Sequence, residues 1–134
     1  MLENNHFVIS SFWEIYSQLT PNEKKAYKDF VESSLFNKKN ALRNIATALL
    51  KIEKGNNVFQ KDTLFAHAFA DKKYNKQVLH NYLVDMKKLL LQFLQIQWIK
   101  NKPALQNWML AETYLQKGLN HPFEKMMLQN NTED

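Results

Sequence analysis

The chain has 134 residues and a formal net charge of +5, with 45% hydrophobic and 23% charged residues. This usage is close to the globular average, so it argues against both a disordered chain and a membrane protein. With only 2 Gly and 3 Pro, the sequence argues against a sandwich, a barrel or a Gly-rich phosphate loop. With 0 Cys, disulfides and thiolate sites are excluded.

A strong helix start signal lies at residues 20–23, after a short first helix. The apolar residues of that first helix recur every three or four positions, as on one buried helix face. They are Val8, Phe12, Tyr16 and Leu19. Thr20 and Glu23 have the spacing of a capping box, and Pro21 suits the first helical position. These residues predict that a second helix begins at Pro21.

Two further helices are predicted before residue 75. The apolar positions of the first lie at i, i+3, i+4, i+7 and i+10. They are Leu42, Ile45, Ala46, Leu49 and Ile52. Gly55 is placed to end this helix as a left-handed cap. A short helix then contains Leu64 and Phe69, with Asp62 near its N-terminal dipole, and residues 71–75 form a turn.

Residues 76–100 carry the longest helical pattern. Written in sevens, the apolar residues fill three columns that are typical of a helix facing a core. The columns contain Leu79, Met86 and Phe93; Tyr82, Leu89 and Ile96; and Leu83 and Leu90. A further column with Val84, Leu91 and Trp98 predicts that the second half is covered from two directions. We therefore expect this helix to be the central one.

The C-terminal residues 103–130 are predicted to form a helical hairpin. Pro103 begins one helix, Gly118 ends it, and Pro122 begins the last. We expect the hairpin to dock on a helical core of residues 10–100. The predicted fold is all-α: one compact domain over residues 1–134, with six or seven helices, a long central helix and a C-terminal hairpin.

Four short motifs lie between residues 10 and 100. They are Leu35-Phe36-Asn37-Lys38, Lys61-Asp62-x-Leu64-Phe65, Tyr74-Asn75 and Leu89-Leu90-x-x-Phe93-Leu94. Together they resemble the N-terminal region of a group of uncharacterised bacterial all-helical proteins. The resemblance implies an all-helical fold and carries no assigned activity.

The hairpin contains Leu110-Ala111-x-x-Tyr114-x-x-x-Gly118. This pattern is similar to the first helix of a tetratricopeptide repeat, in which small residues let paired helices approach. A solitary repeat hairpin cannot bury its own apolar face. The resemblance therefore implies packing on the preceding helices, on another copy or on a continuation of the repeat.

No motif for catalysis or metal binding stands out. The four histidines lack the spacing of a metal-binding helix; they are His6, His67, His80 and His121. The serines lack a frame that would expose a nucleophile, and carboxylates such as Asp29 and Glu32 lie beside lysines on a solvated helix side. We expect no enzymatic activity, no metal and no cofactor.

The favoured hypothesis is a non-enzymatic helical protein–protein interaction module, because large apolar residues gather in a hairpin too short to enclose them. They are Trp108, Met109, Leu115, Phe123, Met126 and Met127. Trp is a favoured interface anchor, and flexible Met adapts to irregular surfaces. The partner would be another protein or a second copy. In the alternative, this face packs against Leu91, Leu94 and Trp98 and completes the domain.

A basic cluster supports a second hypothesis, nucleic-acid binding by a helix-turn-helix-like element. Lys72, Lys73 and Lys76, with Tyr74 between them, lie at the entrance to the long helix, where a helix N-terminus could hold phosphate. The chain has 17 Lys and one Arg, whereas Arg is favoured for bidentate phosphate or base contacts. A solvated turn is therefore the competing interpretation.

The expected location is cytoplasmic, with no membrane partner. No apolar stretch is long enough to cross a bilayer. Residues 1–12 contain Glu3 and no Lys or Arg, unlike the cationic start of a secretory signal.

Overall fold

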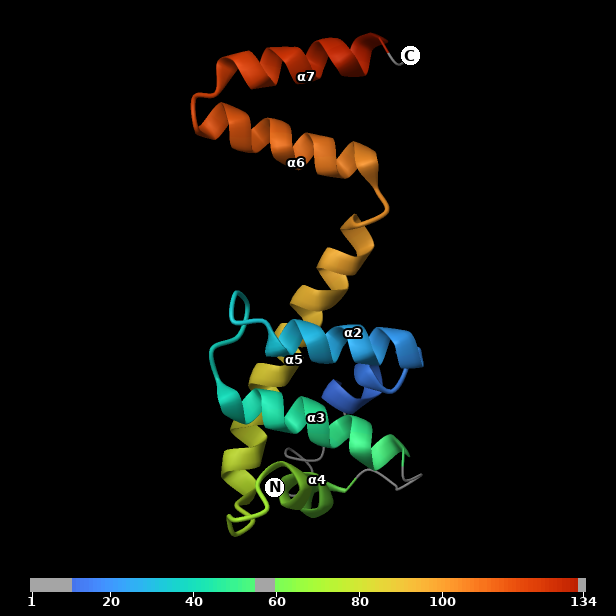
Figure 1. Ribbon diagram of the computed structural model, residues 1–134, viewed down its shortest axis with the longest axis vertical. Helices are drawn as coiled ribbons and strands as arrows, with labels where there is room; N and C mark the ends of the chain where they lie inside the picture. The colour runs from blue at the N-terminus through green and yellow to red at the C-terminus, as the bar shows by residue number, and fades with distance from the viewer. Residues whose placement is uncertain (1–10, 55–59, 133–134) are drawn as a thin grey trace. The chain divides into compact units, whose positions relative to one another are not determined.

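The computed structural model describes residues 11–54 and 60–132, and these described residues form helices joined by turns and contain no strand. Residues 11–16 are helical, and six longer helices follow in chain order (Figure 1). They are α2 (Pro21–Glu32), α3 (Asn40–Lys54), α4 (Lys61–Ala68), α5 (Lys76–Ile99), α6 (Pro103–Gln116) and α7 (Asn120–Thr132). The predicted all-α fold, with a long central helix and C-terminal helices, is confirmed.

Most predicted helix boundaries agree with the structure. α5 begins at Lys76 and ends at Ile99. α7 differs, because it begins at Asn120 rather than at Pro122. Proline is tolerated within the first helical turn, where main-chain N–H groups have no partner in the helix. The predicted cap Gly55 and the predicted helix residue Val8 lie outside the described residues.

The chain divides into two compact units, Met1–Phe93 and Leu94–Asp134, with the boundary inside α5. The first contains α2, α3, α4 and most of α5. The second contains the end of α5 with α6 and α7. Docking of the hairpin on the helical core stays a prediction.

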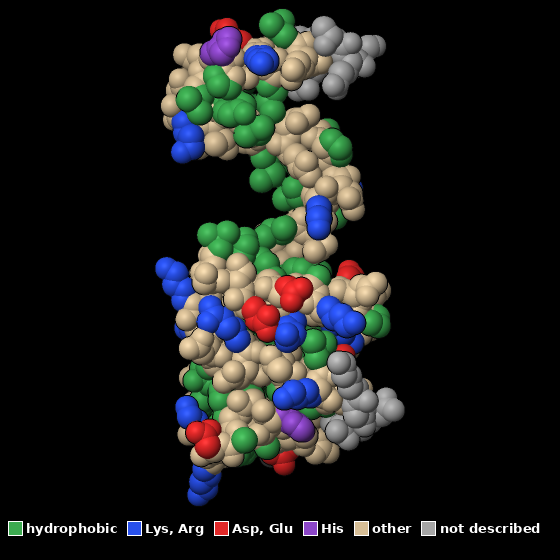
Figure 2. Space-filling model, viewed as in Figure 1, with side chains coloured by type: hydrophobic (Ala, Val, Ile, Leu, Met, Phe, Trp, Pro, Cys, Tyr) green, Lys and Arg blue, Asp and Glu red, His purple; other side chains and the backbone are tan. Residues whose placement is uncertain are grey.

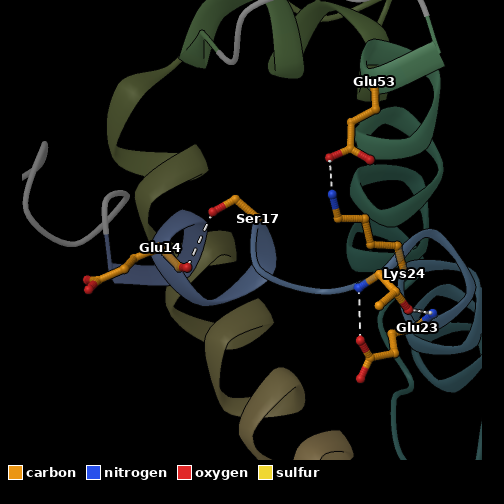
Figure 3. Close-up of polar contacts among 6 residues, drawn as sticks. Glu14, Ser17, Glu23, Lys24 and Glu53 are labelled. Atoms are coloured by element: carbon orange, nitrogen blue, oxygen red, sulfur yellow. Dashed lines mark hydrogen bonds and ion pairs between the residues drawn. The ribbon is translucent and has the colours of Figure 1, made fainter.

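Local side-chain bonds set the start of α2 and join it to α3. The Thr20 main-chain N–H donates to Glu23 Oε1 at 2.8 Å, and the Glu23 N–H donates to Thr20 Oγ1 at 3.2 Å, so the capping box is confirmed. Lys24 Nζ then lies 2.7 Å from Glu53 Oε1 of α3 (Figure 3). In the preceding turn, Ser17 donates to the main-chain oxygen of Glu14.

A continuous row of aromatic rings joins residues 11–16, α2 and α5 in the first unit. Successive ring centroids lie 4.4 to 6.0 Å apart, in the order Phe12, Tyr16, Tyr27, Phe93, Phe30 and Phe36. Such pairs stabilise by about 0.5–1.5 kcal/mol beyond the burial of their area. These contacts connect segments far apart in the sequence, as a core requires.

The side of α5 that packs on α2 is the one its apolar columns predict. Leu79, Leu83, Met86 and Leu90 are fully buried. Leu91, which we expected to be covered from a second direction, is instead exposed. Its position lies on the helix side opposite Met86 and Phe93, which contact Tyr27 of α2.

The loop between α2 and α3 is held by a buried asparagine. Asn37 Nδ2 donates to the main-chain oxygens of Val31 at 2.8 Å and Lys39 at 3.1 Å. Asn37 Oδ1 accepts from the Lys39 N–H at 2.9 Å, and Arg43 Nη2 donates to the Asn37 main-chain oxygen. Asn37 therefore fixes the loop, whereas the sequence showed only a polar turn there.

Candidate interaction surface

The second unit is built around a tight turn between α6 and α7. Gly118 has a φ of 70°, a left-handed conformation that glycine adopts without steric cost. The Gly118 N–H donates to the Leu115 oxygen at 3.2 Å, and the Leu119 N–H donates to the Tyr114 oxygen at 2.8 Å. This pair of bonds is the Schellman motif that ends many helices. The predicted role of Gly118 is confirmed, and α6 and α7 pack side by side (Figure 1).

α6 carries two separate rows of apolar residues. Leu110 and Tyr114, four residues apart, face a groove of about 360 Å³ between the helices, with Pro122 and Met126 of α7 on its other side. Asn107, Lys125 and Gln129 complete its lining. Because four residues are about one helical turn, the α6 lining forms one continuous side of the helix.

The second row of α6, which we call the Trp108 stripe, consists of Ala104, Trp108, Ala111 and Leu115. Its spacing of four, three and four residues puts the four side chains on one helix face. None of these residues lines the groove. Trp108 is 60% exposed and Leu115 51% exposed. The stripe is therefore an apolar face of α6 that the groove does not use.

The second unit has almost no core of its own. Among the described residues from Leu94 onward, only Ala111 is buried. The first unit, in contrast, contains a full set of buried apolar side chains on every helix from α2 to α5. Since the hydrophobic effect stabilises in proportion to the apolar area removed from water, the second unit has little stabilisation from within.

The six hairpin residues predicted to bind a partner fall into two groups. Trp108, Met109 and Leu115 of α6 are exposed. Phe123, Met126 and Met127 of α7 are half-buried. The sequence interpretation missed Leu110, whose spacing of four residues from Tyr114 was the available signal, and Leu128, which is exposed on α7.

The net charge is unevenly distributed between the units. Met1–Phe93 contains 14 basic and 9 acidic residues, and Leu94–Asp134 contains four of each. On the hairpin, the visible face shows groups of hydrophobic side chains and only a few separate charged ones (Figure 2). The whole excess of positive charge therefore belongs to the first unit, and the second unit is neutral.

The three lysines of the second hypothesis lie at the turn before α5. Lys72 and Lys73 are exposed and Lys76 is half-buried, and Lys72 Nζ lies 5.7 Å from the centroid of the Phe69 ring. Asn75 Oδ1 accepts from the Val78 N–H at 3.1 Å. The Asn75 side chain thus occupies one of the main-chain N–H groups at the start of α5, which leaves fewer N–H groups to bind a phosphate.

No protein-family model, curated protein or solved structure matches this chain. The two resemblances noted in the sequence therefore stay predictions. Within residues 11–54 and 60–132, no three His, Asp or Glu side chains are grouped in a way that could hold a metal ion. No helix in this described part of the chain is both long and apolar enough to cross a membrane.

Proposed function

We propose that the protein is a non-enzymatic helical interaction module that binds another protein chain through the α6–α7 hairpin. The observation that carries this proposal is the exposure of Trp108 and Leu115 on α6, in a unit whose described residues include a single buried one. Large exposed apolar groups on a small helical unit are typical of a surface that is covered by a partner.

Covering the exposed side chains of the stripe would contribute to the free energy of binding. Burying one large apolar side chain stabilises by about 1.5–3 kcal/mol. Trp108 and Leu115 are seven residues, or about two helical turns, apart, so a single partner helix can cover both. Their burial would supply a useful part of the free energy of a micromolar complex, which is about 8 kcal/mol.

The side chains of the Trp108 stripe are apolar, so they are complementary to an apolar surface on the partner. Ala104 is exposed and small, so a partner main chain can approach closely there, while Trp108 supplies the kind of anchor that dominates many interfaces. The stripe itself contains no charged residue. The partner face is therefore a row of apolar side chains on a helix, rather than an acidic or basic segment.

The test measures whether water reaches Trp108 in the isolated monomer. In a Trp13→Phe, Trp98→Phe background, Trp108 is the only tryptophan, and its fluorescence should be quenched efficiently by acrylamide at low protein concentration. Circular dichroism checks that the background variant keeps its helices. Protection of Trp108 at every dilution contradicts the proposal and favours closure of the hairpin on the part of α5 that carries Leu91 and Leu94.

A second candidate function is phosphate or nucleic-acid binding at the α4–α5 turn. It is supported by the positive charge of the first unit and by Lys61, which extends the cluster of Lys72, Lys73 and Lys76. Burial and then the nearby Lys76 lower the pKa of Lys61. Binding to a mixed DNA and RNA pool should fall by orders of magnitude between low and physiological salt. Lack of binding at low salt eliminates this candidate.

A further inference from the structure

We infer that the surface around the α4–α5 turn binds single-stranded nucleic acid, with phosphates held by a cluster of lysines and one base stacked on Tyr74. The lysines, which we call the turn cluster, are Lys61, Lys72, Lys73 and Lys76. This inference rests on the second candidate function, because it needs the turn to bind nucleic acid at all. It adds the form of the nucleic acid and the residue that contacts a base, and it is independent of the α6–α7 hairpin.

The lysines of the turn cluster have no acidic partner in the described part of the chain. The ion pairs of the described residues use other lysines, namely Lys24, Lys28 and Lys39. A lysine without a carboxylate partner keeps its charge available for a phosphate, and phosphate contacts by lysine supply most of the sequence-independent affinity for nucleic acids. The turn cluster therefore gathers positive charge that ion pairs do not neutralise.

Lys61 and Lys76 lie close to each other although both are positive. They are the first residues of α4 and α5, and both are half-buried. Burial, and then the nearby Lys76, lower the pKa of Lys61. Two like charges held near each other repel, and an anion that contacts both removes this repulsion. A phosphate group has the negative charge and the acceptor oxygens to bind both ammonium groups.

Tyr74 places an aromatic ring next to these lysines. The ring is 39% exposed, and it meets the buried Phe65 of α4 in a T-shaped contact, with 5.4 Å between the ring centroids. Phe65 packs in turn on Phe69, whose ring lies 5.7 Å from Lys72 Nζ. Tyr74 is thus supported by the core and still partly open to solvent. Stacking of a base on such a ring is the usual sequence-independent contact of proteins that bind single strands.

A duplex fits the same surface less well. Reading a duplex requires side chains that reach base edges in a groove, and arginine is favoured for this contact. The one arginine of the sequence, Arg43, is bound to Asn37 and Asn40 near the start of α3. Gln77, in the first turn of α5, is bonded to Asn81 at 3.0 Å. Unstacked bases of a single strand are accessible to Tyr74 without any of these groups.

One acidic side chain lies at this surface and provides a test of its own. Burial, and then the nearby Asp62, raise the pKa of the Tyr74 hydroxyl, and the Asp62 carboxylate accepts from the Thr63 N–H at 2.9 Å. A carboxylate near Tyr74 repels a phosphate that approaches the turn cluster. Asp62→Asn should therefore strengthen binding, an effect that a surface without contact to nucleic acid would not show.

The experiment measures fluorescence anisotropy with the full chain and a labelled single-stranded thymidine oligonucleotide. A duplex of the same length is the comparison. At low salt the single strand should bind about tenfold more tightly than the duplex, the effect of one stacked base. The logarithm of the affinity should fall with the logarithm of the salt concentration, by about 0.7 for each phosphate that is neutralised.

Lysine variants test the phosphate contacts. The Lys61→Gln, Lys76→Gln double variant should weaken binding and reduce the salt slope by about 0.7, as expected if the two lysines share one phosphate. The matched control is the Lys38→Gln, Lys88→Gln double variant, which removes two exposed lysines outside the turn cluster. It should leave the salt slope almost unchanged. Circular dichroism checks that every variant keeps its helices.

Tyr74→Leu tests the stacked base separately from charge. The leucine keeps an apolar side chain against Phe65 but has no aromatic face. Affinity for the single strand should fall about tenfold, while the salt slope stays the same because no phosphate contact is lost. Affinity for the duplex should change little, since Tyr74 has no unstacked base to contact there.

The outcomes separate this inference from the function on which it rests. Lack of binding to both probes at low salt rejects the second candidate function and the inference together. Equal or tighter binding of the duplex, or wild-type binding by Tyr74→Leu, leaves phosphate binding in place and rejects the single strand. Equal losses in the two double lysine variants show attraction to overall charge and reject the turn cluster. Weaker binding by Asp62→Asn also contradicts the inference.

Discussion

The hydroxyl of Tyr27 on α2 donates a 2.8 Å hydrogen bond to the main-chain oxygen of Met86 on α5. Both residues are buried, and the same Tyr27 ring packs against Phe93, which lies about two helical turns further along the same face of α5. Burial, and then the nearby Tyr16, raise the pKa of the Tyr27 hydroxyl above its ordinary value. A contact between residues 59 positions apart thus joins two helices of the first unit through a neutral phenol.

Tyr27→Phe keeps the ring and removes this hydrogen bond. We expect the free energy of unfolding at neutral pH to fall by about 1 kcal/mol, the typical contribution of one buried hydrogen bond. Urea denaturation followed by circular dichroism measures the change. Tyr114→Phe, at a half-buried tyrosine in the second unit, is the control and should have a smaller effect on the first unit.

Tyr27 should also make the protein sensitive to alkali. Its pKa in the folded state is raised above 10.0, so the unfolded chain loses this proton at a lower pH than the folded protein. The contribution to stability is complete below pH 10 and declines as the pH rises further. Tyr27→Phe should therefore reduce the steepness of this decline. An unchanged slope would mean that Tyr27 ionises equally in both states.

Leu90 and Leu91 are adjacent in α5 but differ in burial, with exposed fractions of 0% and 41%. Leu90→Ala should lower the free energy of unfolding by about 2–5 kcal/mol, the usual range for a fully buried leucine. Leu91→Ala should cost less than about 1 kcal/mol. Equal losses in chemical denaturation would show that Leu91 is covered from a second direction, as its column in the sequence suggested.

Asn37 supplies three side-chain hydrogen bonds inside the α2–α3 loop. Asn37→Ala leaves the buried main-chain oxygen of Val31 and the part-buried main-chain groups of Lys39 without these partners. The expected cost is about 1–3 kcal/mol, measured by thermal or urea unfolding. Asn81→Ala, at an exposed asparagine that pairs with Gln77, should change stability by about 0.5 kcal/mol or less.

Two ion pairs of 2.7 Å differ in their exposure to water. In Lys24–Glu53 the side chains are 13% and 27% exposed, and in Lys39–Asp85 they are 61% and 29% exposed. A double-mutant cycle with Lys24→Met and Glu53→Gln should give a coupling free energy of about 1 kcal/mol. The same cycle at Lys39 and Asp85 should give a weaker coupling that disappears in high salt. The reverse order would contradict the difference in burial.

The features predicted correctly from the sequence depend on interactions between residues that are close together along the chain. The capping box of Thr20 and Glu23 and the left-handed Gly118 involve residues within a few positions of one another, so their outcome follows from the residues alone. The periodic leucines of α5 likewise determine which side of that helix is apolar. These signals were enough for the all-α fold and for the hairpin.

Which apolar and polar residues are buried depends on contacts between segments that are far apart in the sequence. Asn37 looked like an ordinary loop residue, and its burial depends on Val31, Lys39 and Arg43 converging on it. Among the predicted interface residues, the sequence could not separate exposed Trp108 from half-buried Phe123, since both are large aromatic residues. Burial depends on neighbours brought together by folding, and a periodic pattern identifies an apolar face without showing what covers it.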